Sequence, residues 1–188
     1  MNIEPIIESG MSFGPYPEGR CFHIEESETY RNLRSTSSMK MVEFLLLHSS
    51  TPPIIWIIEV KKSSPRPKIK EKTDSKTNEN EKFDNFIEEI RDKLINALSL
   101  YVAICLQRHS TENELPESFQ KLDLKKVDFR FILIINGHKT EWLQPLKDAL
   151  HKALKPTIAA WNLSPLSVLV FNDELAQKQK GLMCKKQE

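Results

Sequence analysis

The chain has 188 residues, 39% of them hydrophobic, and its 27 Lys and Arg against 26 Asp and Glu give a net charge of +1. This length suits one domain spanning residues 1–188, and the overall charge does not by itself predict a nucleic-acid partner. The three cysteines lack Cys-x-x-Cys spacing, which argues against a zinc site or a disulfide framework and fits a reducing compartment. The sequence shows neither an apolar run of membrane-spanning length nor a signal-peptide pattern. We therefore expect an intracellular protein, in cytoplasm or nucleus, without a membrane partner.

The N-terminal part of the chain predicts an irregular arm followed by a short strand and a helix. Residues 1–19 are dense in Pro and Gly, which favours an arm rather than a regular element. Residues 20–25 read as a short strand and residues 25–34 as a helix. Ser27 is a plausible N-cap, and Glu28 then falls in the first helical turn, where it could serve only to complement the helix dipole.

Two apolar runs, residues 41–47 and 54–60, have the length and composition of strands. The Ser-Ser-Thr-Pro-Pro segment between them cannot extend either strand, so we expect the two to pair as a hairpin. Side chains alternate between the faces of a strand, so Glu59 and Lys61 point the same way. If the hairpin register allows, Glu43 lies beside Glu59.

Two carboxylates and a lysine at a strand end have a specific chemical meaning. Mg2+ characteristically takes one or two carboxylates and completes its octahedron with water and phosphate oxygens. The ion polarises a phosphoryl group, and the lysine can position a water molecule or offset developing charge. The alternative is that Glu-Val-Lys-Lys marks only the point where a core strand emerges into water.

These residues resemble the PD-(D/E)XK nuclease superfamily. In that family a helical Glu, a strand acid and an (Asp/Glu)-x-Lys tripeptide bind metal and drive phosphodiester hydrolysis. By this resemblance Glu43 is the strand acid, Glu59 the second acid and Lys61 the lysine. Glu28 is the best match to the helical acid, with Glu25 and Glu26 as alternatives. The chain departs from the pattern by having Val-Glu at residues 42–43 in place of Pro-Asp, which lengthens the acidic side chain by one methylene.

The resemblance implies a restriction-endonuclease-like fold, a mixed β-sheet flanked by helices on both faces. It also implies a Mg2+ or Mn2+ cofactor held by Glu28, Glu43 and Glu59, with Glu43, Glu59 and Lys61 as the catalytic set.

Residues 62–81 are polar and punctuated by proline, and they predict a mobile loop. Between Lys61 and Lys76 the segment has seven Lys and Arg against one Glu and one Asp, an excess that begins at the candidate site. Such a segment could hold a phosphate backbone without reading base sequence. The expected contacts are Lys62, Arg66, Lys68 and Lys70. The alternative is a solvated insertion whose lysines serve solubility.

Residues 81–108 form the clearest helix, with apolar residues at intervals of three and four. By the resemblance, Glu89 or Lys93 on this helix could be a further polar site residue; the alternative is that both belong to a solvated helix face. Residues 110–126 read as a polar connection with a turn near 116–119.

The C-terminal part predicts a central strand at 127–136 and an amphipathic helix at 140–154 stopped by Pro156. A last strand at 166–171 and a polar tail at 173–188 follow. The tail is expected to form a short helix to Lys180 and then to fray.

These features together predict a metal-dependent nuclease that acts on DNA rather than RNA, as a homodimer or in a larger complex. A second hypothesis is a nuclease-fold subunit that no longer cleaves and instead binds nucleic acid or protein. A third is an unrelated interaction module, for which Glu43 and Glu59 would face opposite sides of the sheet.

Overall fold

The computed structural model describes residues 4–48, 50–66, 78–111 and 114–187. Within these ranges a five-stranded sheet has the order β3-β4-β5-β6-β7. Neighbouring strands are antiparallel from β3 to β5 and parallel from β5 to β7, so the sheet is mixed, as predicted. The strands are β3 (Cys21–Phe22), β4 (Phe44–His48), β5 (Ile54–Lys61), β6 (Asp128–Ile135) and β7 (Val168–Asn172).

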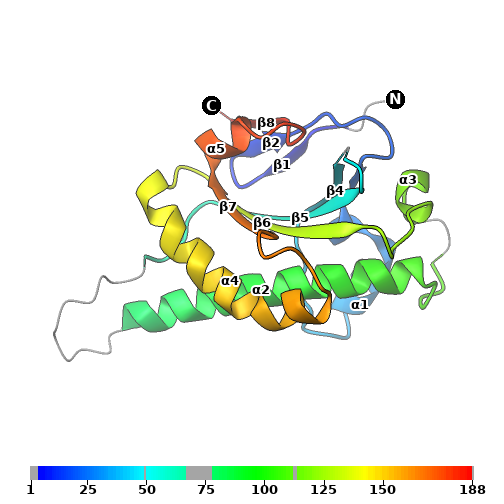
Figure 1. Ribbon diagram of the computed structural model, residues 1–188, viewed down its shortest axis with the longest axis horizontal. Coiled ribbons are helices and arrows are strands. Elements are labelled where there is room, and N and C mark those ends of the chain that lie inside the picture. The colour runs from blue at the N-terminus through cyan, green and yellow to red at the C-terminus, as the bar shows by residue number, and fades with distance from the viewer. Residues whose placement is uncertain (1–3, 49, 67–77, 112–113, 188) are drawn as a thin grey trace.

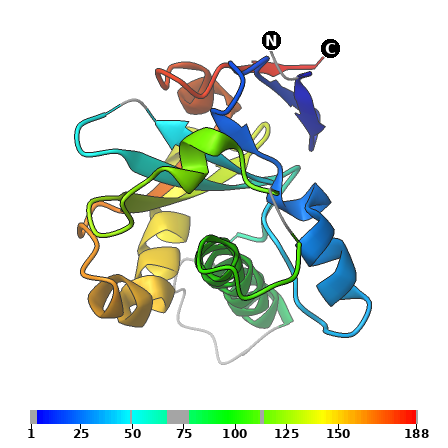
Figure 2. The ribbon, with the colours of Figure 1, turned by 90° about the vertical axis from the view of Figure 1, so that its right-hand side faces the viewer.

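Helices cover one face of this sheet (Figure 1). The long helix α2 (Asn78–Cys105) and α4 (Leu143–Ala160) lie side by side beneath the strands, and α1 (Glu28–Arg34) flanks α2 (Figure 2). The apolar stripe of each helix is buried against one face of the sheet, in a core that includes Ile57 of β5, Phe131 of β6 and Val170 of β7. The short helix α3 (Glu117–Gln120) closes one end of this core through Phe119, which is fully buried.

A small sheet covers the opposite face. The strands β1 (Ile6–Glu8), β2 (Met11–Phe13) and β8 (Cys184–Lys186) pair in the order β1-β2-β8, and α5 (Asp173–Gln177) lies beside them (Figure 1). Helices therefore lie on both faces of the large sheet. Among the described residues, α5 is the helix found on this second face, where it lies beside the small sheet. Phe13 packs its ring 5.4 Å from that of Phe44, centroid to centroid, as part of a second buried cluster.

The irregular arm predicted for residues 1–19 was wrong for residues 6–13, which form β1, a turn and β2, and the fraying predicted for the end of the tail was wrong because β8 lies there. Each strand of the small sheet has only three residues, and β2 pairs with β8 through contacts such as Phe13 opposite Cys184. The two-residue turn between β1 and β2 has positive φ at Ser9 and Gly10, the geometry favoured in tight hairpins. Pairing between the two ends of the chain leaves no local pattern, so Pro and Gly content was misleading here.

Two predicted helix limits also need correction. The helix predicted at 25–34 is divided into a 3-10 turn, η1 (Ile24–Glu26), and α1, which Ser27 caps by accepting a hydrogen bond from the Tyr30 amide. The helix α2 begins at residue 78, so the predicted loop 62–81 ends sooner. Residues 62–66 of that loop are irregular, and residues 67–77 lie outside the described residues.

The sequence had predicted that Pro156 stops α4. The prediction was wrong, because α4 continues to Ala160. The 3-10 turn η2 (Thr140–Trp142) precedes it. Beyond the proline, Ile158 is buried in the core, and the Trp161 ring lies 6.0 Å from that of Phe129 in a T-shaped contact. Packing of this last turn offsets the hydrogen bond that proline cannot make. Within the described ranges, no helix is long and apolar enough to cross a membrane.

Candidate functional site

The β4–β5 hairpin brings Glu43 and Glu59 to the same face of the large sheet. Phe44 is paired with Ile58, so the same register one position further along places Glu43 opposite Glu59. Both follow the phase of Ile57, which faces the helices, whereas Val60 belongs to the core on the other face. This is the relationship expected from strand phase, and the opposite-face arrangement expected of the third hypothesis is not found.

Glu59 is fully buried and is held by two lysines. Lys93 Nζ lies 2.7 Å, and Lys61 Nζ 3.0 Å, from the same oxygen, Glu59 Oε1. Burial raises the pKa of Glu59, and the two ammonium groups act against that rise. The other oxygen, Oε2, is buried and has no hydrogen-bond partner among the described residues. The Glu59 carboxylate therefore has one oxygen paired with two ammonium groups and one oxygen, Oε2, without a hydrogen-bond partner among the described residues.

Glu43 lies in a cluster of acidic side chains. Its pKa is raised to about 9, mainly by burial and in smaller part by a hydrogen bond to Glu25 and by the negative charges of Glu59, Glu25 and Glu8. Glu43 is consequently protonated at neutral pH when no cation is bound. A divalent cation would favour the ionised form, because opposite charge close to a carboxylate lowers its pKa.

Of the three candidates Glu25, Glu26 and Glu28, the structure brings Glu25 beside Glu43. Glu28, the preferred choice from the sequence, is exposed at the start of α1. The reason is local: η1 ends at Glu26, and Ser27 is extended (φ −62°, ψ 145°), so the helical phase restarts after it. Glu28 as a metal ligand stays a prediction, whereas Glu25, one of the two alternatives, is hydrogen-bonded to Glu43.

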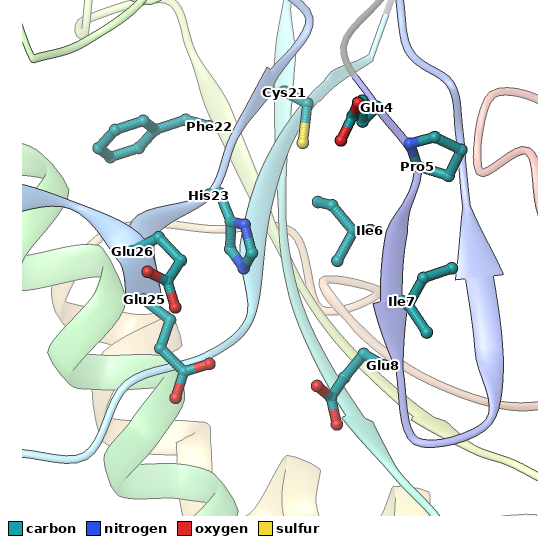
Figure 3. A pocket seen from close by; sticks show the side chains of 10 residues that line it. All are labelled: Glu4, Pro5, Ile6, Ile7, Glu8, Cys21, Phe22, His23, Glu25 and Glu26. Carbon is teal, nitrogen blue, oxygen red and sulfur yellow. The ribbon is translucent and has the colours of Figure 1, made fainter.

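A groove of about 610 Å³ opens between β1 and the segment formed by β3 and η1. Its walls include Glu8, His23, Glu25 and Glu26. Figure 3 shows Glu8 and Glu25 extending from opposite walls of this groove. Two of the carboxylates that raise the pKa of Glu43, those of Glu8 and Glu25, therefore line this groove.

The long helix contributes two side chains to the site, Glu89 and Lys93, which are one helical turn apart. Glu89 Oε1 lies 3.7 Å from Lys61 Nζ, and Glu89 Oε2 lies 3.0 Å from Lys40 Nζ. The Lys93 side chain is only 11% exposed, so for this residue the solvated-face alternative was wrong. Burial lowers the pKa of Lys61, but the carboxylates of Glu59 and Glu89 outweigh it and raise the pKa. Lys61 is therefore a permanent cation, suited to electrostatic stabilisation rather than to accepting a proton.

The basic segment after β5 is described only at its beginning. Lys62 is exposed, and Arg66 lies over the ring of Trp142. Lys68 and Lys70, the other predicted nucleic-acid contacts, lie outside the described residues. The first part of the segment thus follows the surface next to Lys61.

Comparison of the chain with protein-family models, with curated proteins and with solved structures found no match. In the ranges that the structure describes, no group of three His, Cys, Asp or Glu side chains is placed so that it could hold a metal ion. A Mg2+ ion needs only one or two carboxylates, however, when water and phosphate oxygens complete its coordination. The function therefore has to be inferred from the chemistry of Glu43, Glu59 and the lysines.

Proposed function

We propose that this protein is a metal-dependent nuclease with a restriction-endonuclease-like fold, which hydrolyses phosphodiester bonds of nucleic acid, with DNA as the substrate. The observation that carries the proposal is the open oxygen of Glu59. Its Oε2 atom is buried and unpartnered among the described residues, on the sheet face that also presents Glu43. An unsatisfied buried carboxylate oxygen is costly, and a hard cation would satisfy it.

The donor set fits Mg2+ or Mn2+. Glu59 and Glu43 would hold the ion, and Glu25, hydrogen-bonded to Glu43, is placed to assist. Carboxylate oxygens are the ligands that such hard cations prefer. When bound, the ion would polarise the phosphoryl group and lower the pKa of a coordinated water.

The lysines have separate tasks in this proposal. Lys93 fixes the Glu59 carboxylate through Oε1, which leaves Oε2 for the ion. Lys61, a cation that is 27% exposed, can contact a phosphate oxygen and stabilise the negative charge that develops there. In the reaction the water oxygen forms a bond to phosphorus while the bond to the leaving oxygen breaks. Lys61 already carries its proton, so the proton of the water must pass to solvent or to a carboxylate.

A second candidate function is an inactive nuclease-fold subunit, and the lysine pair is the observation that favours it. Lys93 and Lys61 already balance the charge of Glu59, and Glu43 is neutral at pH 7. The site can therefore be electrostatically satisfied without a metal. Such a protein would bind nucleic acid or protein without cutting.

Cleavage assays separate the two candidates. The substrates are labelled single-stranded DNA, duplex DNA and RNA, each in the presence of Mg2+, Mn2+ or EDTA. Each is incubated with the unmodified protein, with Glu59→Gln or with Lys61→Met. The matched control is Glu88→Gln, which changes an exposed carboxylate on α2. The nuclease proposal expects metal-dependent cleavage that Glu88→Gln retains and the two site variants lose. Binding without cleavage under every condition would overturn it in favour of the inactive subunit.

A further inference from the structure

Arg66, Lys139 and Trp142 form a cationic and aromatic cluster next to the candidate site. The Arg66 Cζ atom lies 3.5 Å from the centroid of the Trp142 ring, and Lys139 Nζ lies 5.1 Å from the same centroid. The His138 ring meets Trp142 edge-on, with centroids 5.1 Å apart. At 3.5 Å the guanidinium is in van der Waals contact with the indole, so Trp142 holds Arg66 in place.

This cluster lies at the same sheet edge as Lys61. The Asn136 amide donates a hydrogen bond of 2.8 Å to the Lys61 carbonyl, which joins the carboxyl ends of β5 and β6. Further along the two segments, Ser64 Oγ and His138 Nε2 are 3.4 Å apart. The chain leaving β5 therefore runs alongside the chain leaving β6. A strand of nucleic acid at Lys61 would continue onto Arg66 and Trp142.

The cations of the cluster are open to a ligand. Arg66 and Lys139 are both exposed, and neither forms an ion pair with a carboxylate within the described ranges. Unpaired bases stack on aromatic rings and on arginine guanidinium planes, and lysines neutralise the phosphates beside them. A duplex keeps its bases stacked inside the helix, so only a single strand can use such a surface.

We propose that Arg66 and Trp142 bind a base of single-stranded DNA by stacking, while Lys139 contacts a neighbouring phosphate. This inference rests on the proposed function, and it specifies the substrate as a single strand or the unpaired end of a duplex. The base extends the existing stack on the outer side of Arg66. The basic residues at the start of the segment thus recognise unpaired DNA through stacking as well as through charge.

The test is binding of a fluorescent oligothymidylate to the full chain in EDTA, where metal-dependent cleavage cannot occur. Trp142→Leu removes the ring, and Arg66→Lys keeps the charge but removes the plane. The control Trp161→Leu removes a ring that is 43% exposed and packs on Phe129 at the other end of α4. Because stacking on one aromatic contributes about 1–3 kcal/mol, we expect Trp142→Leu to weaken binding by about 5- to 150-fold. Arg66→Lys should weaken it at least about threefold, and Trp161→Leu should have no effect.

Salt dependence and a duplex provide the second readout. Lys139→Ala should reduce the slope of log affinity against log salt by about 0.7, the value for one lost phosphate contact on a single strand. Arg66→Lys should keep the slope, and the ring variant should leave duplex affinity unchanged. Equal affinities of Trp142→Leu, Arg66→Lys and the unmodified protein for the oligothymidylate would overturn the inference even if DNA is cleaved. Conversely, stacking-dependent binding without cleavage in Mg2+ would leave the inference standing while the nuclease proposal fails.

Discussion

Lys93 Nζ lies 2.7 Å from Glu59 Oε1, so a side chain of α2 makes a buried ion pair with one 34 residues away on β5. Glu59 is fully buried, and its charge could not be kept there without such partners. The pair also orients the carboxylate, since Lys93 and Lys61 both approach Oε1 and leave Oε2 open. Fold stability and site geometry therefore depend on the same contact.

Replacing Lys93 by methionine should destabilise the protein. Glu59 would keep only Lys61, and a hydrogen bond to a charged group contributes about 1.5–3 kcal/mol. Urea unfolding at pH 7 measures this loss. The matched control is Arg91→Met on the same helix, which loses a pair with the exposed Asp92 and should cost less than about 1 kcal/mol. The double variant Glu59→Met/Lys93→Met should recover stability, because apolar residues of similar volume can replace a buried ion pair. Equal destabilisation by Lys93→Met and Arg91→Met would contradict this account.

The stability of the metal-free protein should decrease as the pH rises toward 9. Burial, Glu25 and Glu59 raise the pKa of Glu43 to about 9 in the folded state, above its ordinary value in the unfolded chain. A carboxyl group shifted in this direction contributes its full stability below the unfolded pKa and loses it as the pH rises through the folded pKa. Thermal unfolding in EDTA should therefore show a loss of at least about 1.4 kcal/mol between about pH 5 and pH 9, the free energy of a tenfold change in proton affinity.

Glu43→Gln tests the origin of this pH dependence. The amide cannot ionise, so the variant should show a flatter profile and should be more stable than the unmodified protein at about pH 9. Glu28→Gln, which changes an exposed carboxylate nearby, should leave the profile unchanged. A profile as steep in Glu43→Gln as in the unmodified protein would assign the dependence to another group, such as Glu59, whose pKa burial also raises.

Strand phase was sufficient to predict the central part of the site. Alternation places Glu59 and Lys61 on one face without any tertiary information, whereas the position of Glu43 beside Glu59 also depends on the hairpin register, which the pairing of Phe44 with Ile58 supplies. Lys93 could not be chosen over its neighbours on the helix, because only the packing angle of α2 on the sheet decides which charges point inward. Glu89 and Lys93 were named from the sequence only through the family resemblance, with a solvated helix face as the alternative.

Glu25 and the small sheet show what local sequence patterns leave undetermined. The position of Glu25 depends on the break between η1 and α1, which one extended residue, Ser27, produces. The Ser27 cap was itself predictable. Because Ser27 is extended, the side chain of Glu28, in the first turn of α1, points in a different direction from the side chains of η1. The β1-β2-β8 sheet depends on pairing between the two ends of the chain, which no window of local sequence contains.

Glu25 rather than Glu28 should control the affinity of the site for divalent cations. Glu25 is hydrogen-bonded to Glu43, whereas Glu28 is exposed on α1. Binding of Mn2+, followed by electron paramagnetic resonance of the free ion, should weaken by about 10-fold or more in Glu25→Gln. That loss corresponds to one weakened ligand or outer-shell contact. Glu28→Gln should bind Mn2+ as the unmodified protein does. The reverse order of the two variants would restore Glu28 as the helical acid, and absence of Mn2+ binding to any form would contradict the metal site.

Pro156→Ala should stabilise the protein, because Pro156 is an exposed residue within a helix that continues for four more residues. Alanine restores the amide that can donate to the Lys152 carbonyl, and the helix-interior preference for Ala over Pro is about 3 kcal/mol. The unfolded chain gains freedom, which subtracts up to about 1 kcal/mol, so we expect a net gain of about 2 kcal/mol in urea unfolding. Pro145→Ala is the matched control: this proline is also exposed, but it lies in the first turn of α4, where the amide has no helical partner. It should give no gain. Equal effects of the two substitutions would mean that packing of Ile158 and Trp161, rather than the backbone of α4, determines the stability of the last turn.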